Sequence, residues 1–429
     1  MELKKTTYSE LGESVYTTTH ESGLKIYIMP KKGFSKSYAV FATKYGSINT
    51  DFVVPGENEV TTVPDGVAHF LEHKVFEEED GKNAFDRFAK YGASANAFTS
   101  FAMTAYLFSC TDYFYENLDI LLDYVQKPYF TYENVEKEKG IIAQEIRMYN
   151  DSPDNVLYFN ALKCLYKNHP ARIEIAGSVE SIMEIDKDIL YKCYNTFYHP
   201  SNMVLYVVGD VDENKVLELV KKNIRQNQNP GEIKQIFPHE PEEINEPYME
   251  KRLNTSIPKF IIGFKDSEVG GSGRDMLKRE IESSIIIEIL SGRSSPLYKK
   301  LYEGGLVTSS FGGYYNYEES FGWAAIQGEG NDPKKVKELV LEEIENIKEN
   351  GIDKEAFERQ KKVLYGQFLR MLNSLEGFGN EFVGATLRGS NLFDYPHIVR
   401  EVSLDDVTKR FNTLFRNDRC ALSVVLPSN

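Results

Sequence analysis

The stretch Gly66–Phe76, which reads GVAHFLEHKVF, decides how the rest of the chain is interpreted. In an α-helix, His69 and His73 are four residues apart and lie on one face, and Glu72 lies on the same side. The two apolar residues between His69 and Glu72 point elsewhere, into the protein. Two imidazoles and a carboxylate on one face of an apolar helix form half of a zinc site together with a general base.

The glutamate directly precedes the second histidine, which gives the inverted pattern His-x-x-Glu-His rather than His-Glu-x-x-His. A hydrolytic zinc site needs a third protein ligand and one open position for water. We therefore expect a downstream carboxylate from another helix. Because two histidines and a glutamate also reach this spacing by chance on amphipathic helices, the pattern needs support from the rest of the chain.

Size and composition narrow the classes of protein that need to be considered. A chain of 429 residues suggests two or more domains, and a net charge of −15 makes nucleic acid an unsuitable partner. We expect no membrane span, because no apolar run reaches about 18 residues, and no signal peptide, because the start MELKKTTY lacks an apolar segment. Buried free thiols in a reducing cytoplasm are expected for the four scattered cysteines, Cys110, Cys164, Cys193 and Cys420.

The region before the histidine helix is expected to be largely extended. Residues 24–31 and 37–48 alternate apolar and polar side chains and predict strands. Residues 49–64 predict a loop, and Asp65, or Pro64 with it, is the expected start of the helix. Residues 82–91 predict a second amphipathic helix.

The segment GASANAFTSF at 92–101, with TAYLF at 104–108, predicts a strand with little side-chain bulk. The residues alone favour an ordinary strand with a bulge. The alternative is an edge strand that pairs with an extended peptide through its backbone.

A predicted helix at 132–150 is rich in acidic residues. It carries Glu133, Glu136, Glu138 and Glu145. Glu138 and Glu145 are two turns apart and share a face. A glutamate-rich helix is usually a solvated surface. Beside a histidine pair that lacks its third ligand, however, one glutamate could complete the zinc site and another could hold a ligand imidazole.

Residues 226–248 contain four prolines and form the best linker in the sequence. We therefore predict an N-terminal metal-binding domain at 1–228, a linker at 229–250 and a C-terminal domain at 251–429. A further helix is predicted at 178–198, with Asp186 near a helix start.

After the linker the pattern restarts, as a weak repeat of about 200 residues. Helix 353–373 echoes helix 132–150, with Gln360 and Gln367 near the positions of the two glutamates. A helix broken near Gly292 is predicted at 277–302. The counterpart of the histidine helix, around 283–301, lies within it and contains no histidine. Only the first copy can therefore hold a metal.

These features together resemble the M16 metallopeptidases, the family of pitrilysin, insulinase and the mitochondrial processing peptidase, over nearly the whole chain. The resemblance is carried by HFLEH at 69–73, NAFTS at 96–100 with Thr104 and Tyr106, Glu138 and Glu145, Gly177-Ser178 with Ser181-Ile182, FYHPSNM at 197–203 and Gly209-Asp210. It implies an α+β fold (an α/β roll) of two similar domains. Each domain would be a mostly antiparallel sheet packed by helices, and together they would form half of a clam-shell.

The resemblance also implies the function of individual residues. His69, His73 and Glu145 would bind one zinc ion per chain, Glu72 would activate water as the catalytic base, and Glu138 would brace the site. The reaction would be zinc-dependent hydrolysis of extended peptides within a chamber formed with a second chain.

The same resemblance assigns the segment Asn96, Ala97 and Phe98 to substrate binding, with the backbone of the strand holding the peptide beside the metal. It therefore favours the edge strand over the ordinary strand at this position.

One departure concerns a substrate-binding Arg and Tyr that active members of the family carry in the second copy. Here Tyr302 stands where the Arg is expected, and Thr308 or Ser309 where the Tyr is expected. This pattern is similar to bacterial members that work in pairs. It predicts a dimer, and specifically a heterodimer with a paralogue that supplies the Arg and Tyr.

Two other functions are less consistent with the sequence than a peptidase. A catalytically silent scaffold or peptide-binding subunit is disfavoured, because such members usually lose the His and Glu residues that are all present here. A zinc hydrolase of small molecules is disfavoured by the strand at 95–108, which suits a peptide backbone.

Overall fold

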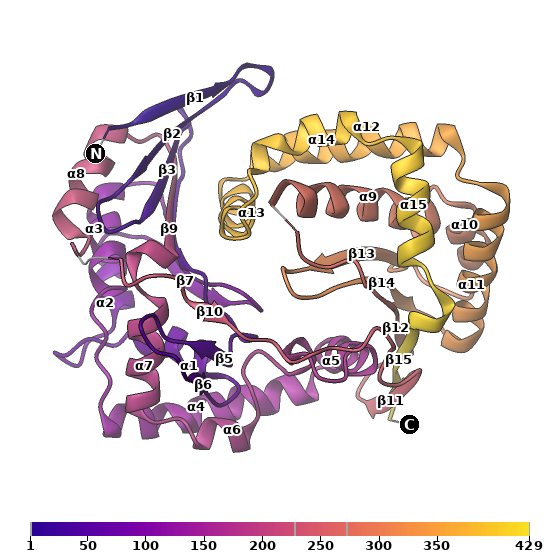
Figure 1. Ribbon diagram of the computed structural model, residues 1–429, viewed down its shortest axis with the longest axis horizontal. Helices are drawn as coiled ribbons and strands as arrows, with labels where there is room; N and C mark the ends of the chain where they lie inside the picture. The colour runs from indigo at the N-terminus through magenta and orange to yellow at the C-terminus, as the bar shows by residue number, and fades with distance from the viewer. Residues whose placement is uncertain (1, 227–228, 272, 429) are drawn as a thin grey trace. The chain divides into compact units, whose positions relative to one another are not determined.

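The computed structural model describes residues 2–226, 229–271 and 273–428, which fold into two compact units (Figure 1). Unit 1 comprises the chain up to Ile146, Glu174–Ile236 and Leu369–Leu387. Unit 2 comprises Arg147–Ile173, Phe237–Phe368 and the chain from Arg388 onward. Each unit therefore combines segments that are far apart in the sequence.

Unit 1 is built on a seven-stranded sheet. Its strands, in spatial order, are β1 (Lys4–Tyr8), β2 (Glu13–Thr19), β3 (Lys25–Pro30), β9 (Met203–Gly209), β4 (Ser37–Thr43), β8 (Thr104–Cys110) and β7 (Ser94–Thr99). Only the β3–β9 pair is parallel among these neighbours. Strands β4 and β9 are buried along their whole length, as expected for central strands with continuous apolar runs. Strand β7 forms one edge of the sheet.

Helices pack around this sheet and on its flanks. They are α1 (Val67–Val75), α2 (Ala84–Ala89), α3 (Phe114–Tyr124), α4 (Tyr132–Asp151), α6 (Val179–Met183), α7 (Lys187–Phe197), α8 (Glu213–Asn223) and α13 (Leu375–Leu387). Helix α1 packs beside β7 and β8, and α13 packs on β4 and β9. Helix α1, with His69 and His73, and the first part of α4, with Glu138 and Glu145, therefore both belong to unit 1.

Unit 2 is built on a five-stranded sheet, in the order β11 (Tyr248–Leu253), β15 (Cys420–Pro427), β12 (Lys259–Lys265), β14 (Gly322–Glu329) and β13 (Gly312–Tyr317). Its β11–β15 pair is parallel and the others are antiparallel. This order repeats β3, β9, β4, β8 and β7 of unit 1, including the single parallel pair. The two similar, mostly antiparallel α+β units expected from the sequence are therefore present.

The helices of unit 2 are α5 (Pro153–Leu165), α9 (Gly273–Ser291), α10 (Pro296–Glu303), α11 (Pro333–Asn350), α12 (Lys354–Met371), α14 (Tyr395–Glu401) and α15 (Leu404–Leu414). Short 3-10 turns occur at Ser9–Leu11, Pro170–Arg172, Pro200–Asn202, Leu392–Asp394 and Asn417–Arg419. The break near Gly292 that was predicted in the helix at 277–302 is confirmed, because α9 ends at Ser291 and α10 begins at Pro296.

The two halves of the sequence exchange one helix each. Helix α13 comes late in the chain but packs on the unit 1 sheet, where a Cβ on Gly379 would lie 2.8 Å from the Tyr38 ring. Tyr38 also donates a 2.6 Å hydrogen bond to Asn380 on that helix. Helix α5 comes early in the chain but packs on β12 and β15 of unit 2, with Leu165 over Gly263. Neither helix was predicted from the sequence.

Three local predictions were wrong. Residues 49–64 are not a loop but a small hairpin, β5 (Asp51–Val53) and β6 (Val60–Thr62), which pairs with β10 (Lys234–Gln235). Burial of Phe52 explains why this segment is ordered. The predicted helix 178–198 is two helices, α6 and α7, but Asp186 does lie at a helix start, because its side chain caps α7. The third concerns α1, which begins after Gly66 and not at Asp65.

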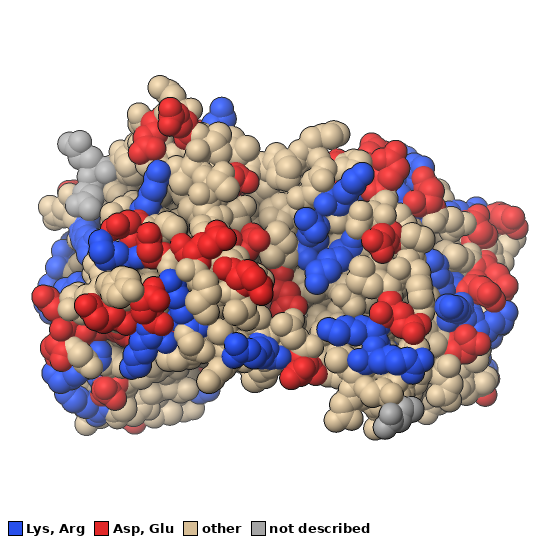
Figure 2. All heavy atoms as spheres, turned by 90° about the horizontal axis from the view of Figure 1, so that it is seen from below, with Lys and Arg blue, Asp and Glu red and all other residues tan. Residues whose placement is uncertain are grey.

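Other expectations from composition can be compared with the structure. All four cysteines are buried free thiols, as predicted. Among the helices of the described ranges, none combines the length and apolar character needed to span a bilayer. On the face shown in Figure 2, acidic and basic side chains are interspersed, so the charge of this face is not of one sign.

Candidate metal centre

The start of α1 is fixed by a close backbone contact. Helix α1 begins after Gly66, which has φ +91° and no side-chain cap, so the predicted start at Asp65 was wrong by one residue. A Cβ on Gly66 would lie 2.4 Å from the Ala176 carbonyl oxygen. The Ser181 hydroxyl donates a 2.9 Å hydrogen bond to the Asp65 carbonyl. The segment leading into α6 therefore sets where α1 begins, and only glycine fits there.

Helix periodicity then brings the two histidines together on α1. Their ring centroids are 4.6 Å apart. Glu145 on α4 faces both rings, with Oε1 3.7 Å from His69 Nε2 and Oε2 3.4 Å from His73 Nε2. Ligand atoms of the three residues all lie within 4.8 Å of one another. Two imidazole nitrogens and one carboxylate oxygen are a donor set that suits zinc in a hydrolytic site.

Glu138, one of the two glutamates singled out on α4, contacts the outer nitrogen of a candidate ligand. Its Oε1 lies 3.0 Å from His73 Nδ1. Burial alone would favour a neutral carboxyl, but the hydrogen bond and charge of His73, together with Lys74, hold the pKa of Glu138 below its ordinary value. Burial also opposes protonation of His73, but Glu138 and the other nearby carboxylates outweigh it and raise the pKa of His73. Glu138 thus fixes the ring so that Nε2 faces Glu145.

Lys74 lies on the other side of Glu138 from His73 and contacts both α1 and α4. Its side chain is fully buried, with Nζ 2.6 Å from Glu77 Oε2 and 3.7 Å from Glu138 Oε2. It also donates a 3.1 Å hydrogen bond to the Asn134 carbonyl at the start of α4. A buried cation therefore links α1 to α4 and supplies a counter-charge to Glu138.

Glu72 lies on the same helix face as the histidines, and a residue of the sheet donates a hydrogen bond to its carboxylate. Thr99, the last residue of β7, donates a 2.7 Å hydrogen bond from Oγ1 to Glu72 Oε2. The candidate base is thus fixed relative to both the histidines and the edge strand.

The comparisons with known proteins agree with this geometry. Residues 58–179 match the family described as "Insulinase (Peptidase family M16)", and residues 184–364 match "Peptidase M16 inactive domain". The zinc protease YmfH of Bacillus subtilis, described as uncharacterized, is 44% identical over all of both chains. This chain belongs to the M16 peptidase family.

Two solved structures share the fold. A crystal structure from Alicyclobacillus acidocaldarius, described as M16-like, superposes with a TM-score of 0.93 at 36% identity, covering 97% of this chain and 99% of the other. A protease from Helicobacter pylori gives a TM-score of 0.80 at 20% identity, with 96% and 99% covered. The latter comparison supports the fold alone.

The M16 resemblance placed substrate on β7, and the structure places this strand at the edge of the sheet. Asn96 is exposed, whereas Ala97 and Phe98 are half-buried. The Asn96 side-chain oxygen accepts a 2.9 Å hydrogen bond from the Ala97 backbone N–H.

The residues at the expected Arg and Tyr positions of the M16 second copy lie in unit 2. Tyr302 on α10 is about half exposed and stacks on Tyr298. Thr308 hydrogen-bonds Ser310 at 2.7 Å. Position 302 therefore holds a tyrosine where an arginine is expected, and position 308 holds a threonine where a tyrosine is expected.

An arginine and a tyrosine do meet in unit 2, but in its interior. The Arg410 guanidinium lies 5.2 Å from the Tyr315 ring centroid, and both side chains hydrogen-bond Asp266. Asp266 and Arg410 are buried. This pair therefore serves the core of unit 2 and does not replace the missing M16 pair.

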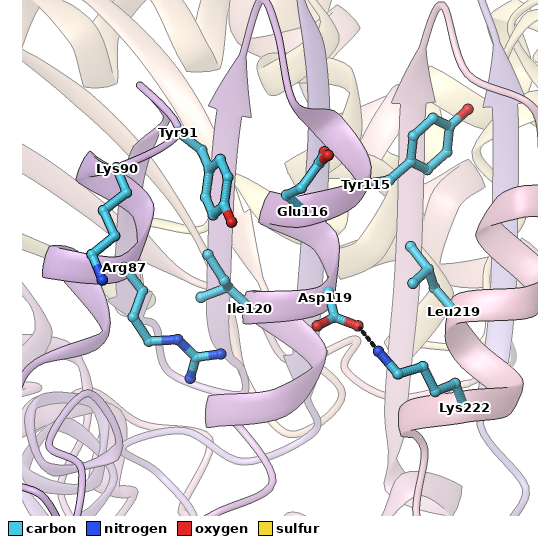
Figure 3. Close-up of a pocket in the computed structure, with 9 residues that line it drawn as sticks. All are labelled: Arg87, Lys90, Tyr91, Tyr115, Glu116, Asp119, Ile120, Leu219 and Lys222. Carbon is cyan, nitrogen blue, oxygen red and sulfur yellow. Dashed lines mark hydrogen bonds and ion pairs between the residues drawn. The ribbon is translucent and has the colours of Figure 1, made fainter.

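Unit 1 has two surface hollows that lie apart from the candidate metal ligands His69, His73 and Glu145. One, of about 450 Å³, lies between α2, α3 and α8 (Figure 3). The other, of about 820 Å³, shares Arg87 and Lys90 with it. Several charges there are already paired, including Lys222 with Asp119 and Arg87 with Asp123. Neither hollow includes a metal-site residue.

Sequence reasoning missed two members of the site, Lys74 and Thr99. Thr99 was noticed only as part of a motif, and Lys74 only as a neighbour of His73. The sequence did contain a signal for Lys74, because it lies between His73 and the apolar residues Val75 and Phe76. A lysine that is buried at such a position almost always has a charged or polar partner. Its partners could not be identified without the packing of α4 against α1.

Proposed function

We propose that the chain is a zinc-dependent endopeptidase that cleaves extended peptides, with His69, His73 and Glu145 as ligands of one zinc ion. The convergence of their donor atoms within 4.8 Å carries this proposal. It is supported by Glu72 on the same helix face and by relatives named zinc proteases. Glu138 and Lys74 would hold the His73 imidazole in place.

The residues of this chain would divide the work of amide hydrolysis. A bound zinc ion supplies Lewis acidity and makes water easier to deprotonate at neutral pH. Glu72 accepts a proton from the attacking water and returns it to the leaving amine nitrogen. Asn96, Ala97 and Phe98 align the peptide as an added strand on β7, which leaves its scissile bond beside Glu72.

We further propose that full activity needs a second chain. Tyr302 and Thr308 leave the second copy without the Arg and Tyr of active relatives, so a paralogue would supply them in a heterodimer that encloses the peptide. Because the four buried cysteines are free thiols, we assign the enzyme to the reducing cytoplasm. Its substrates would be peptides, with neither nucleic acid nor membrane as a partner.

Metal analysis and peptidase assays test the proposal together. Wild type should contain about one zinc per chain after metal-replete purification. Glu72→Gln should keep the zinc and lose peptidase activity, whereas Glu79→Gln, a change at an exposed glutamate just after α1, should retain it. Zinc-free protein, or undiminished cleavage by Glu72→Gln, would refute the assignment.

The need for a partner is tested by measuring cleavage of unstructured peptides with the chain alone and with a co-expressed paralogue. Restoration of activity only in the mixture supports the heterodimer. Full activity of the isolated chain refutes it. Zinc binding without cleavage in either preparation would favour the alternative, a silent peptide-binding subunit.

A further inference from the structure

The contact between Thr99 and Glu72 joins the end of the edge strand to the candidate base. Thr99 Oγ1 lies 2.7 Å from Glu72 Oε2 and is the donor. The two residues come from different elements, β7 and α1, and are 27 positions apart. Thr99 is half-buried, so water has limited access to this side of the carboxylate.

The neighbouring hydroxyl shows why Thr99 must donate to the carboxylate. Thr104 lies directly across from Thr99 in the β7–β8 register, with their hydroxyl oxygens 3.5 Å apart. Thr104 is fully buried and donates its only hydroxyl proton to the Tyr45 carbonyl at 2.8 Å. It therefore has no proton for Thr99, and the Thr99 proton is directed to the nearer acceptor, Glu72.

We propose that Thr99 is a positioning residue. Its hydroxyl occupies Glu72 Oε2 with a hydrogen bond, so that Oε1 is the oxygen that exchanges a proton with the nucleophilic water. This inference rests on the proposed peptidase function. Water gives its proton to Oε1 while its oxygen bonds to the scissile carbonyl carbon. The same proton then passes to the amide nitrogen as the carbon–nitrogen bond breaks, so Glu72 is regenerated.

The hydroxyl matters because the base works only in a narrow range of positions. A carboxylate with one oxygen fixed keeps its other oxygen oriented, whereas a free carboxylate rotates about its last bond. Outer hydrogen-bond partners of this kind typically change activity about 10- to 100-fold when removed.

The test compares Thr99→Val, which keeps the shape but removes the hydroxyl, with Thr99→Ser, which keeps the hydroxyl. Thr62→Val is the matched control, because Thr62 also donates to a carboxylate, that of Asp51, on an exposed hairpin. All are full-length chains, assayed in the assembly that gives wild-type cleavage. The zinc content, kcat and KM are measured for each variant.

Thr99→Val should lose about 10- to 100-fold in kcat, with KM changed less than about twofold and the zinc content unchanged. Thr99→Ser and Thr62→Val should remain close to wild type. An unchanged kcat in Thr99→Val would overturn the proposal. So would an equal loss in Thr99→Ser, because the hydroxyl would then not be the cause.

A second measurement does not depend on activity. Crystal structures of zinc-free wild type and Thr99→Val should show the Glu72 carboxylate in one orientation in the former and displaced or in several orientations in the latter. An unmoved carboxylate would contradict the positioning role even if no peptide is cleaved. If Glu72→Gln remains active while the carboxylate moves, the peptidase mechanism fails but the Thr99 contact stands.

Discussion

Glu138 Oε1 lies 3.0 Å from Nδ1 of His73, the nitrogen that faces away from Glu145. The contact fixes the imidazole ring in the orientation that places Nε2 beside the other candidate ligands. Glu138 is itself almost completely buried. The orientation of a candidate metal ligand is therefore set by a carboxylate on a different helix.

We expect Glu138→Gln to weaken zinc binding about 10- to 100-fold, because an amide is a poorer acceptor for the imidazole N–H than a carboxylate. The measurement is zinc affinity by competition with a chromogenic chelator. Glu133→Gln, at an exposed glutamate on the same helix, is the control and should bind zinc like wild type. Equal affinities of Glu138→Gln and the control would contradict the bracing role.

Lys74→Met should destabilise the fold by about 2–3 kcal/mol, because it leaves the buried Glu138 with less positive charge nearby and removes the bond to the Asn134 carbonyl. Urea unfolding measures the effect. Lys127→Met is the control, since Lys127 pairs with Asp123 at an exposed position. That variant should change stability by less than about 1 kcal/mol. Comparable effects of the two variants would show that Lys74 is not structurally important.

Gly66→Ala should cost about 3 kcal/mol or more. The residue combines φ +91° with a Cβ position 2.4 Å from the Ala176 carbonyl oxygen. Gly92→Ala separates the two causes, because Gly92 has φ +65° with nothing within 4 Å of its Cβ position. That variant should cost only about 1 kcal/mol. Similar urea midpoints for the two variants would mean that the backbone at Ala176 moves aside at little cost in stability, so that the close contact with Gly66 is not required.

His169 should make stability depend on pH. It is buried in unit 2, and its Nδ1 accepts a 3.0 Å hydrogen bond from the Ala171 N–H while Nε2 contacts Ser320. Burial, aided by the Lys265 charge and opposed by Glu240, lowers the pKa of His169 from 6.5 to about 4. Because the unfolded chain takes up the proton more readily, this contribution to stability is present above pH 6.5 and is lost as the pH falls toward 4.

The expected size is a loss of about 2 kcal/mol between pH 7.5 and 5.0 that His169→Asn does not show, since asparagine can accept the same backbone hydrogen bond without titrating. Urea unfolding at both pH values, with His239→Asn as an exposed control, provides the measurement. If wild type and His169→Asn lose the same stability over this range, another group is responsible.

Elements that depend on local sequence patterns were predicted correctly, whereas elements that depend on contacts with distant segments were missed. The strand at 24–31 and the helices around His69 and Glu145 were found because their apolar periodicity is local. The hairpin at 51–62 was missed because its strands are three residues each and depend on a third strand from residues 234–235. Helices α5 and α13 were missed as well. Each packs on a sheet formed largely by the other half of the sequence.

The sequence by itself determined that His69, Glu72 and His73 share a face, because helix geometry places residues three and four apart side by side wherever the helix lies. It also limited the third ligand to a few acidic residues on one later helix. Only the tertiary structure decided that Glu145 faces both rings, that Glu138 and Lys74 lie behind His73, and that Thr99 holds Glu72. The physical reason is that these contacts join separate elements, whose relative positions depend on the packing of the whole unit.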